Sequence, residues 1–109
     1  MNEVTEPKCG CIAAAIRIIG DKWSGFLIRE LTAGPRRFGV LQEAMPGISP
    51  RTLSQRLDLL EAEKIITKQT FAEVPPRVEY ALTPKGEDLI PILQSMIAWG
   101  DKYGTEQSE

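Results

Sequence analysis

Residues 47–57 read Gly-Ile-Ser-Pro-Arg-Thr-Leu-Ser-Gln-Arg-Leu, an order that predicts where a helix begins. Ser49 is a suitable N-cap, because its hydroxyl can accept a hydrogen bond from a free backbone N–H of the first turn. Pro50 follows at the first helical position, where a proline already has the right φ and its missing N–H costs nothing. We expect this helix to run from Pro50 to about Glu63.

The two sides of this helix differ in chemistry. Leu53, Leu57 and Leu60 recur at helical spacing, which predicts that they face the core. The opposite surface carries polar side chains, namely Arg51, Thr52 and Gln55, with Ser54 and Arg56 on the flanks. A cationic helix N-terminus that is rich in hydrogen-bonding groups suits phosphates and base edges. Taken alone, the segment fits a solvated amphipathic helix with ordinary surface arginines equally well.

The neighbouring segments place this helix in a larger motif. Residues 38–45 have the apolar spacing of a short helix, which the Pro46-Gly47 pair stops. Residues 65–71 are rich in β-branched residues and residues 77–82 alternate in polarity, so we expect two strands that pair as a hairpin. A short helix, a tight turn and a cationic second helix form a helix-turn-helix. A hairpin directly after it forms the wing of a winged helix.

Three more elements complete the predicted fold. Apolar spacing predicts a first helix over about 11–19 and a second that ends near residue 33, with Asp21 placed to cap the second. Thr83-Pro84 begins a last helix, which Pro91 should kink or restart. The predicted class is mainly α with a small β-hairpin, a winged helix-turn-helix in the order α-α-α-α-β-β-α.

Apolar residues indicate what is buried. Ile12 and Ile16 recur with helical spacing and mark one side of the first helix. The last helix has apolar residues over more than one narrow stripe, which favours a partner surface. Four aromatic residues are expected to pack in the core, Trp23, Phe26, Phe38 and Tyr80. A ligand pocket lined by Trp23 is the less favoured interpretation.

Length and charge bound the function. The 109 residues suffice for one domain, which we expect over residues 9–104 between a flexible arm (1–8) and a flexible tail (105–109). Residues 36–57 hold four arginines and one glutamate, a net charge of +3 in a chain of net charge −2, so the rest carries −5. This asymmetry predicts a basic face on an acidic body. The polar N-terminus and the lack of a long apolar run predict a cytoplasmic protein without a membrane span.

Composition argues against an enzyme. The chain has no histidine and two cysteines, which excludes a histidine-based triad and a histidine metal site. A single chain also lacks the four soft ligands that structural zinc requires. There is no glycine-rich phosphate loop and no convincing pair of carboxylates. We therefore expect neither catalysis nor a cofactor.

Several motifs in this order resemble the HxlR-type regulators. They include Ile19-Gly20-Asp21-Lys22-Trp23, Gly34-Pro35-Arg36-Arg37-Phe38, Leu53-Ser54-Gln55-Arg56-Leu57 and Pro75-Pro76-Arg77-Val78-Glu79-Tyr80. The resemblance covers roughly residues 9–100. It implies a winged-helix transcription factor related in architecture to the MarR group, which acts as a homodimer through its terminal helices. Several members of that family sense electrophiles or oxidants through a cysteine at the start of the first helix.

The cysteines of this chain depart from the family pattern. The family usually has Cys-Pro ten residues ahead of the glycine that matches Gly20, but here Gly10 takes the cysteine position and Cys11 the proline position. Cys9 lies on the other side. A positive helix end and Lys8 would lower a thiol pKa there, which favours the reactive thiolate that a regulatory thiol needs. Plain packing of small cysteines near a helix start explains these residues at least as well, and an intersubunit metal site is the third interpretation.

The resemblance and the chemistry together assign the candidate DNA contacts. Base edges suit Arg51, Thr52 and Gln55. The phosphate contacts are expected from Ser49, Arg36, Arg37 and Arg56, while Pro50 and Ser54 belong to the same helix surface. Arg56 has an alternative pairing with Glu63 or Asp58. Arg77 would carry the contacts of the wing, with Lys68 as the second candidate. Glu73 near the tip lowers the positive charge of the wing.

These residues predict a transcriptional regulator that binds an inverted repeat of double-stranded DNA as a homodimer. The helix at about 50–63 would enter the major groove, and the wing at about 71–77 would lie on the flanking backbone or minor groove. A small-molecule or oxidant effector fits the thiol hypothesis. The alternative is a winged helix that serves only for protein contact, because a fold does not fix a function.

Overall fold

The computed structural model describes residues 12–104. The predictions for the arm, the tail, Cys9 and Cys11 concern residues outside this range. The elements in chain order are α1 (Ile12–Ile19), α2 (Lys22–Leu31), α3 (Phe38–Ala44), α4 (Pro50–Ala62), β1 (Ile66–Phe71), β2 (Arg77–Leu82), α5 (Pro84–Glu87) and α6 (Ile90–Tyr103). The predicted class, mainly α with one hairpin in a winged helix-turn-helix, is confirmed.

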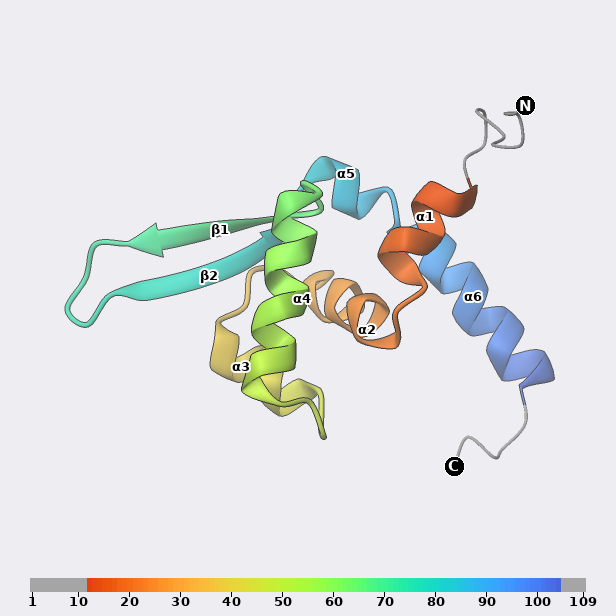
Figure 1. Ribbon diagram of the computed structural model, residues 1–109, viewed down its shortest axis with the longest axis horizontal. Helices are drawn as coiled ribbons and strands as arrows, with labels where there is room; N and C mark the ends of the chain where they lie inside the picture. Colours follow the sequence, from red (N-terminus) through yellow and green to blue (C-terminus); the bar gives the residue numbers. More distant parts are fainter. Residues whose placement is uncertain (1–11, 105–109) are drawn as a thin grey trace.

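The arrangement separates the hairpin from the terminal helices. Figure 1 shows β1 and β2 extending from one side of the molecule, while α1 and α6 lie on the opposite side. Between them, α4 runs in front of α2, with which it is in contact. The helix-turn-helix, formed by α3 and α4, is therefore flanked by the wing on one side and by the terminal helices on the other.

Side-chain caps start three of the helices where the sequence predicts them. Asp21 Oδ2 accepts a hydrogen bond from Ser24 N at 2.9 Å and so caps α2. Ser49 Oγ accepts from Thr52 N at 3.0 Å at the start of α4. The third cap is Thr83, whose Oγ1 accepts from Gly86 N at 3.0 Å in α5. Such caps are local interactions, which is why local sequence predicts them.

The end of α4 has a geometry that the sequence does not announce. Lys64 has a φ of 66°, in the left-handed region that usually favours glycine. Its N–H donates to Glu61 O at 3.0 Å, and Ile65 N–H donates to Leu60 O at 2.9 Å. This pair of hydrogen bonds is a Schellman motif. It reverses the chain from α4 into β1.

The hairpin is regular, and one residue outside it also pairs with β2 through an isolated β-bridge. β1 and β2 pair antiparallel from Ile66 opposite Leu82 to Phe71 opposite Arg77. Arg36, just before α3, pairs with Tyr80 through backbone hydrogen bonds of 2.9 and 2.8 Å. These bonds attach the base of the wing to the helix-turn-helix.

One core joins the helix-turn-helix to the sheet. It is made of aliphatic residues from α2, α3, α4 and the start of β1, including Leu27, Ile28, Leu41, Leu53, Leu57, Leu60, Ile65 and Ile66. Tyr80 is buried, and Trp23 and Phe38 pack against the core while partly exposed. The prediction for Phe26 is wrong, because 45% of this residue is exposed. Instead it lines an open cavity between α2 and α6.

The last helix is divided in two. α5 ends at Glu87, and α6 begins at Ile90 with Pro91 in its first turn. Pro91 therefore restarts the helix, as one of the two predicted outcomes, and the fold has one more helical segment than the predicted order. The second helix also ends at Leu31, slightly earlier than predicted, where Gly34 with a φ of 130° turns the chain. Within residues 12–104, no helix has the length and apolar character to cross a membrane.

Candidate nucleic-acid interface

The first two turns of α4 present polar side chains outward. Arg51, Ser54 and Gln55 are exposed, as are the cap Ser49 and Pro50. The buried leucines at 53, 57 and 60 hold the opposite side in the core, as predicted. The sequence prediction of one buried and one polar side is therefore confirmed for this helix.

Thr52 is held by the cap. Its N–H and its Oγ1 both interact with Ser49, since Ser49 Oγ accepts from the N–H and donates to Thr52 Oγ1 at 3.0 Å. Thr52 is half-buried. Its hydroxyl oxygen thus accepts a hydrogen bond within the helix start, while its O–H hydrogen and its methyl group are not used by that bond.

Further along α4 the outward surface becomes acidic. Asp58 and Glu61 are exposed in the second half of the helix. An acidic surface is repelled by phosphates, because both carry negative charge. The cationic, hydrogen-bonding part of α4 is therefore restricted to the segment from Ser49 to Gln55.

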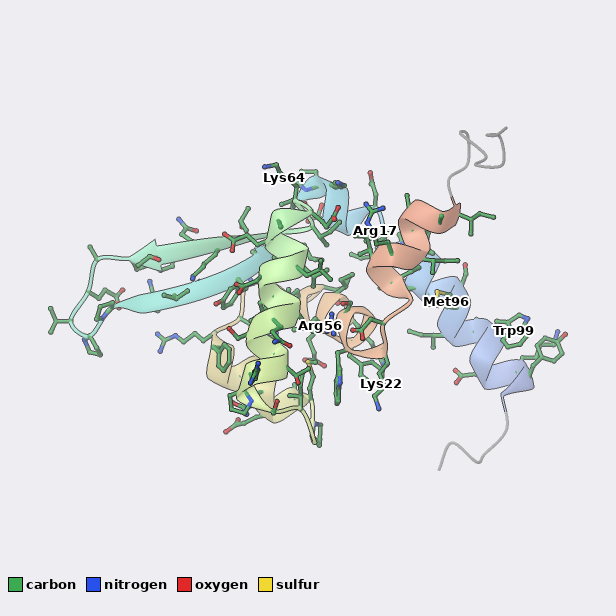
Figure 2. The ribbon with its side chains drawn as sticks, viewed as in Figure 1. Arg17, Lys22, Arg56, Lys64, Met96 and Trp99 are labelled. Carbon is green, nitrogen blue, oxygen red and sulfur yellow. The ribbon has the colours of Figure 1, made fainter. Side chains whose placement is uncertain are left out.

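Arg56 does not share the outward surface. It is half-buried on the flank of α4 that faces α2, where its Nε lies 3.4 Å from Asp21 Oδ2 (Figure 2). The sequence suggested a carboxylate such as Glu63 or Asp58 as the alternative partner of Arg56; Arg56 does pair with a carboxylate, but with that of Asp21. Local sequence could not reveal Asp21, which lies on a different element.

Glu63 has a different partner from the one predicted. Its Oε1 accepts from Arg17 Nη2 at 3.3 Å, which connects the end of α4 to α1. Lys85 Nζ also donates to Glu63 O at 2.8 Å. Side chains of α1 and α5 thus both contact the C-cap residue of α4.

The two arginines before α3 have different surroundings. Arg37 is exposed at the N-cap position of α3 and makes no side-chain cap there. Arg36 is half-buried, its backbone pairs with Tyr80, and its Nη1 donates to Pro35 O at 3.0 Å. Arg37 is therefore the freer of the two cations.

The charge of Arg77 is balanced within the wing. Its Nη2 lies 3.0 Å from Glu73 Oε2 and its Nε lies 3.7 Å from Glu79 Oε2. Its guanidinium also stacks 4.0 Å from the centroid of the Phe71 ring. Lys68 is exposed on β1. The wing thus carries less available positive charge than its arginine suggests, in line with the sequence argument from Glu73.

A second surface, on the terminal helices, is apolar. We call it the terminal-helix surface and define it by its large exposed hydrophobic side chains, Ile12, Ile16, Ile92, Met96, Ile97, Trp99 and Tyr103. Trp99 is 65% exposed, and Figure 2 shows it with Met96 on α6. A cavity of about 210 Å³ opens between α2 and α6, lined in part by Phe26, Leu93 and Met96. Apolar periodicity placed Ile12 and Ile16 on one side of α1, but both are exposed, and the buried residue of that helix is Ile18, which the predicted stripe did not include.

No metal site is built from the described residues. From Ile12 to Gly104, no three acidic or cysteine side chains gather where they could hold an ion. The two cysteines lie outside that range. The described part of the chain offers a polar surface at the start of α4 and an apolar surface on the terminal helices.

Comparisons with known proteins identify the family. Residues 18–108 match the family described as HxlR-like helix-turn-helix. An HTH-type transcriptional regulator of Methanothermobacter thermautotrophicus is 40% identical over 96 residues, which are 88% of this chain and 73% of that protein. The transcriptional regulator YodB of Bacillus subtilis is 38% identical over 87% of this chain and 85% of its own length.

Solved structures agree with the sequence matches. The reduced form of YodB has a TM-score of 0.79 at 37% identity and covers 89% of this chain and 95% of its own. The redox regulator HypR in its oxidized form has a TM-score of 0.80 at 36% identity, over 84% of this chain and 94% of its own. The chain therefore belongs to the HxlR family of helix-turn-helix transcriptional regulators.

Proposed function

We propose that this regulator binds an inverted repeat of double-stranded DNA as a homodimer, with the start of α4 in the major groove. The observation that carries the proposal is the polar surface from Ser49 to Gln55, on which Arg51 and Gln55 are exposed while the leucines behind it are buried. In a helix-turn-helix, the N-terminal residues of the second helix are the ones that reach base edges.

The proposed contacts follow the exposure of each side chain. Arg51 suits guanine and Gln55 suits adenine, because each can form two hydrogen bonds to one base edge. The Thr52 methyl group suits the methyl group of thymine. Phosphate contacts are assigned to Ser49 and Arg37, and more weakly to Arg36, with Pro50 and Ser54 lining the same surface. Lys68 on the wing adds to them, whereas Arg77 contributes little because two carboxylates neutralise it.

The terminal-helix surface supports the homodimer. Seven large apolar side chains stand exposed on α1 and α6, and a surface of that kind is usually covered by a partner. We assign a second copy of this chain as that partner, because α1 and α6 lie on the side of the molecule away from the wing (Figure 1). Two copies joined there would present two α4 helices, and their half-sites would lie about one helical turn of DNA apart.

The test is a binding titration with labelled duplex DNA at several salt concentrations. A duplex selected by the protein from random-sequence DNA should bind as an inverted repeat, and its affinity should fall steeply with salt, because each phosphate contact contributes a slope of about −0.9 in log K against log salt. A shuffled duplex should bind more weakly. Equal, weak binding to both duplexes, or none at all, would contradict the proposal and favour a module for protein contact.

We further propose that thiol oxidation controls this binding. Two observations support this. The chain resembles HypR, which is a redox regulator, and YodB, whose structure is of a reduced form. Cys9 and Cys11 also precede α1 closely in the sequence. An intrachain disulfide across one residue would be strained, so the proposed product is a disulfide between subunits or a mixed disulfide. Two thiols would lose two protons and two electrons to the oxidant.

Diamide, a thiol oxidant, tests this idea. Treatment should change the affinity for the selected duplex in the unmodified protein, and dithiothreitol should reverse the change. Variants Cys9→Ser and Cys11→Ser, alone and together, identify the thiol. An equal response in the double variant would show that neither cysteine senses the oxidant.

A further inference from the structure

One carboxylate oxygen accepts two hydrogen bonds and forms an ion pair at the junction of α1, α2 and α4. Asp21 Oδ2 accepts from Ser24 N at 2.9 Å and from Ser24 Oγ at 3.2 Å, and Arg56 Nε lies 3.4 Å from it. Ser24 is fully buried. The carboxylate therefore has little freedom to follow Arg56 if that side chain moves.

Arg56 is held on its side of the contact as well. The side chains of Arg56 and Asp21 are each 32% exposed, and the Nε atom of Arg56 is itself buried. Breaking a half-buried pair leaves a charge without its partner, which is unfavourable compared with a pair on an open surface. In this position Arg56 lies on the flank of α4 and not on its outward surface (Figure 2).

A second ion pair occurs on the same flank. Glu63 follows Arg56 by about two helical turns and pairs with Arg17 of α1 at 3.3 Å. Arg17 is 60% exposed, so this pair contributes little on its own. Together the two ion pairs connect α4 to α1 and to Asp21, the N-cap residue of α2. The Asp21–Arg56 pair is the stronger connection, because it is less exposed.

We propose that Arg56 is a positioning residue that fixes the orientation of α4 against α2. Asp21, by pairing with Arg56, keeps the positive charge of Arg56 away from the DNA backbone. The inference rests on the proposed function, because it concerns how α4 meets DNA. Base contacts from Arg51 and Gln55 need α4 at a fixed angle, whereas a phosphate contact only needs a cation nearby. Asp21 and Arg56 would therefore determine specificity more than affinity.

Three variants and one control separate the two roles of Arg56. Arg56→Gln removes the charge. Asp21→Ser removes the carboxylate but keeps an N-cap for α2, since serine caps as well as aspartate. The double variant combines them. Glu43→Gln removes a carboxylate from an exposed position of α3, so it controls for the change in net charge.

The measurement is affinity for the selected and the shuffled duplex as a function of salt. Arg56→Gln should leave the salt slope unchanged and lower the ratio of the two affinities about fivefold, within the range for coupled neighbours. Asp21→Ser should free Arg56 to reach a phosphate. Its slope on both duplexes should steepen by about 0.9 relative to Glu43→Gln, and the double variant should lose that increase.

Other results would contradict either the positioning role of Arg56 or the role of Asp21. If Arg56→Gln reduces the slope by about 0.9 on both duplexes, Arg56 is a phosphate contact and the inference is wrong. If Arg56→Gln leaves the ratio of the affinities for the two duplexes unchanged, Arg56 has no positioning role. If the salt slope of Asp21→Ser equals that of Glu43→Gln, Asp21 does not keep Arg56 from the phosphates. If the unmodified protein binds neither duplex, the proposed function fails first, and the inference fails with it.

Discussion

Ser49 illustrates how single residues start the helix that we assign to DNA. Its Oγ accepts from Thr52 N at 3.0 Å and donates to Thr52 Oγ1 at 3.0 Å. The same hydroxyl lies exposed at the positive end of the α4 dipole, where a phosphate would be attracted. One side chain therefore serves stability and, by our proposal, binding.

Replacing Ser49 tests its contribution to stability. Ser49→Ala should lower the free energy of unfolding by about 1 kcal/mol, because Thr52 N–H loses its acceptor. Ser49→Asn keeps a capping oxygen and should stay close to the unmodified protein. Urea unfolding followed by circular dichroism measures both. Equal stability of the alanine and asparagine variants would show that the cap contributes nothing.

At the scale of elements, α4 shows what sequence can and cannot reveal. The cap, the proline and the buried leucines are local features, and the sequence predicts all of them. The contacts that orient α4 are between distant elements, such as Arg17 with Glu63, 46 residues apart. Periodicity and spacing carry no information about such pairs, so they could not identify Asp21 as the partner of Arg56.

The end of α4 makes the same point for the backbone. Lys64 adopts a φ of 66° without being glycine, so the turn into β1 has no signal in the sequence beyond the end of the apolar pattern. Lys64→Gly should raise the free energy of unfolding by about 0.5–1 kcal/mol, because it relieves the left-handed conformation while paying some backbone entropy. Thermal unfolding measures the change.

Lys64→Ala is the matched control for this prediction. It removes the same charge but keeps a Cβ in the left-handed conformation. It should leave the stability nearly unchanged. If alanine stabilises the protein as much as glycine does, the effect comes from the charge and not from the backbone.

At the scale of the whole molecule, two exposed surfaces differ in chemistry. The polar start of α4 and the terminal-helix surface lie on different elements, and most residues of the core belong to α2, α3, α4 and the hairpin. The sequence predicted the apolar stripe of α1 but not that Ile12 and Ile16 stay exposed, because periodicity does not say what covers a stripe. Phe26 was misassigned for the same reason.

The homodimer can be tested through that surface. Trp99→Glu combined with Met96→Glu should shift the protein from a dimer to a species near the 12.1 kDa of one chain, because two charges would be buried in the interface. Sedimentation equilibrium gives the mass. Val74→Glu, at the fully exposed tip of the wing, introduces the same chemistry elsewhere and should remain dimeric. A monomeric unmodified protein would contradict this assignment.

The central claim is that the exposed start of α4 reads DNA sequence, and Arg51 tests it most directly. Sequence selection from random duplexes should give an inverted repeat with the unmodified protein. Arg51→Ala should relax the preference at one position in each half-site, at a cost of about 1–3 kcal/mol for that base, whereas Arg37→Ala should weaken all sequences alike. An Arg51→Ala protein that selects the same repeat with the same preference at every position would contradict the account.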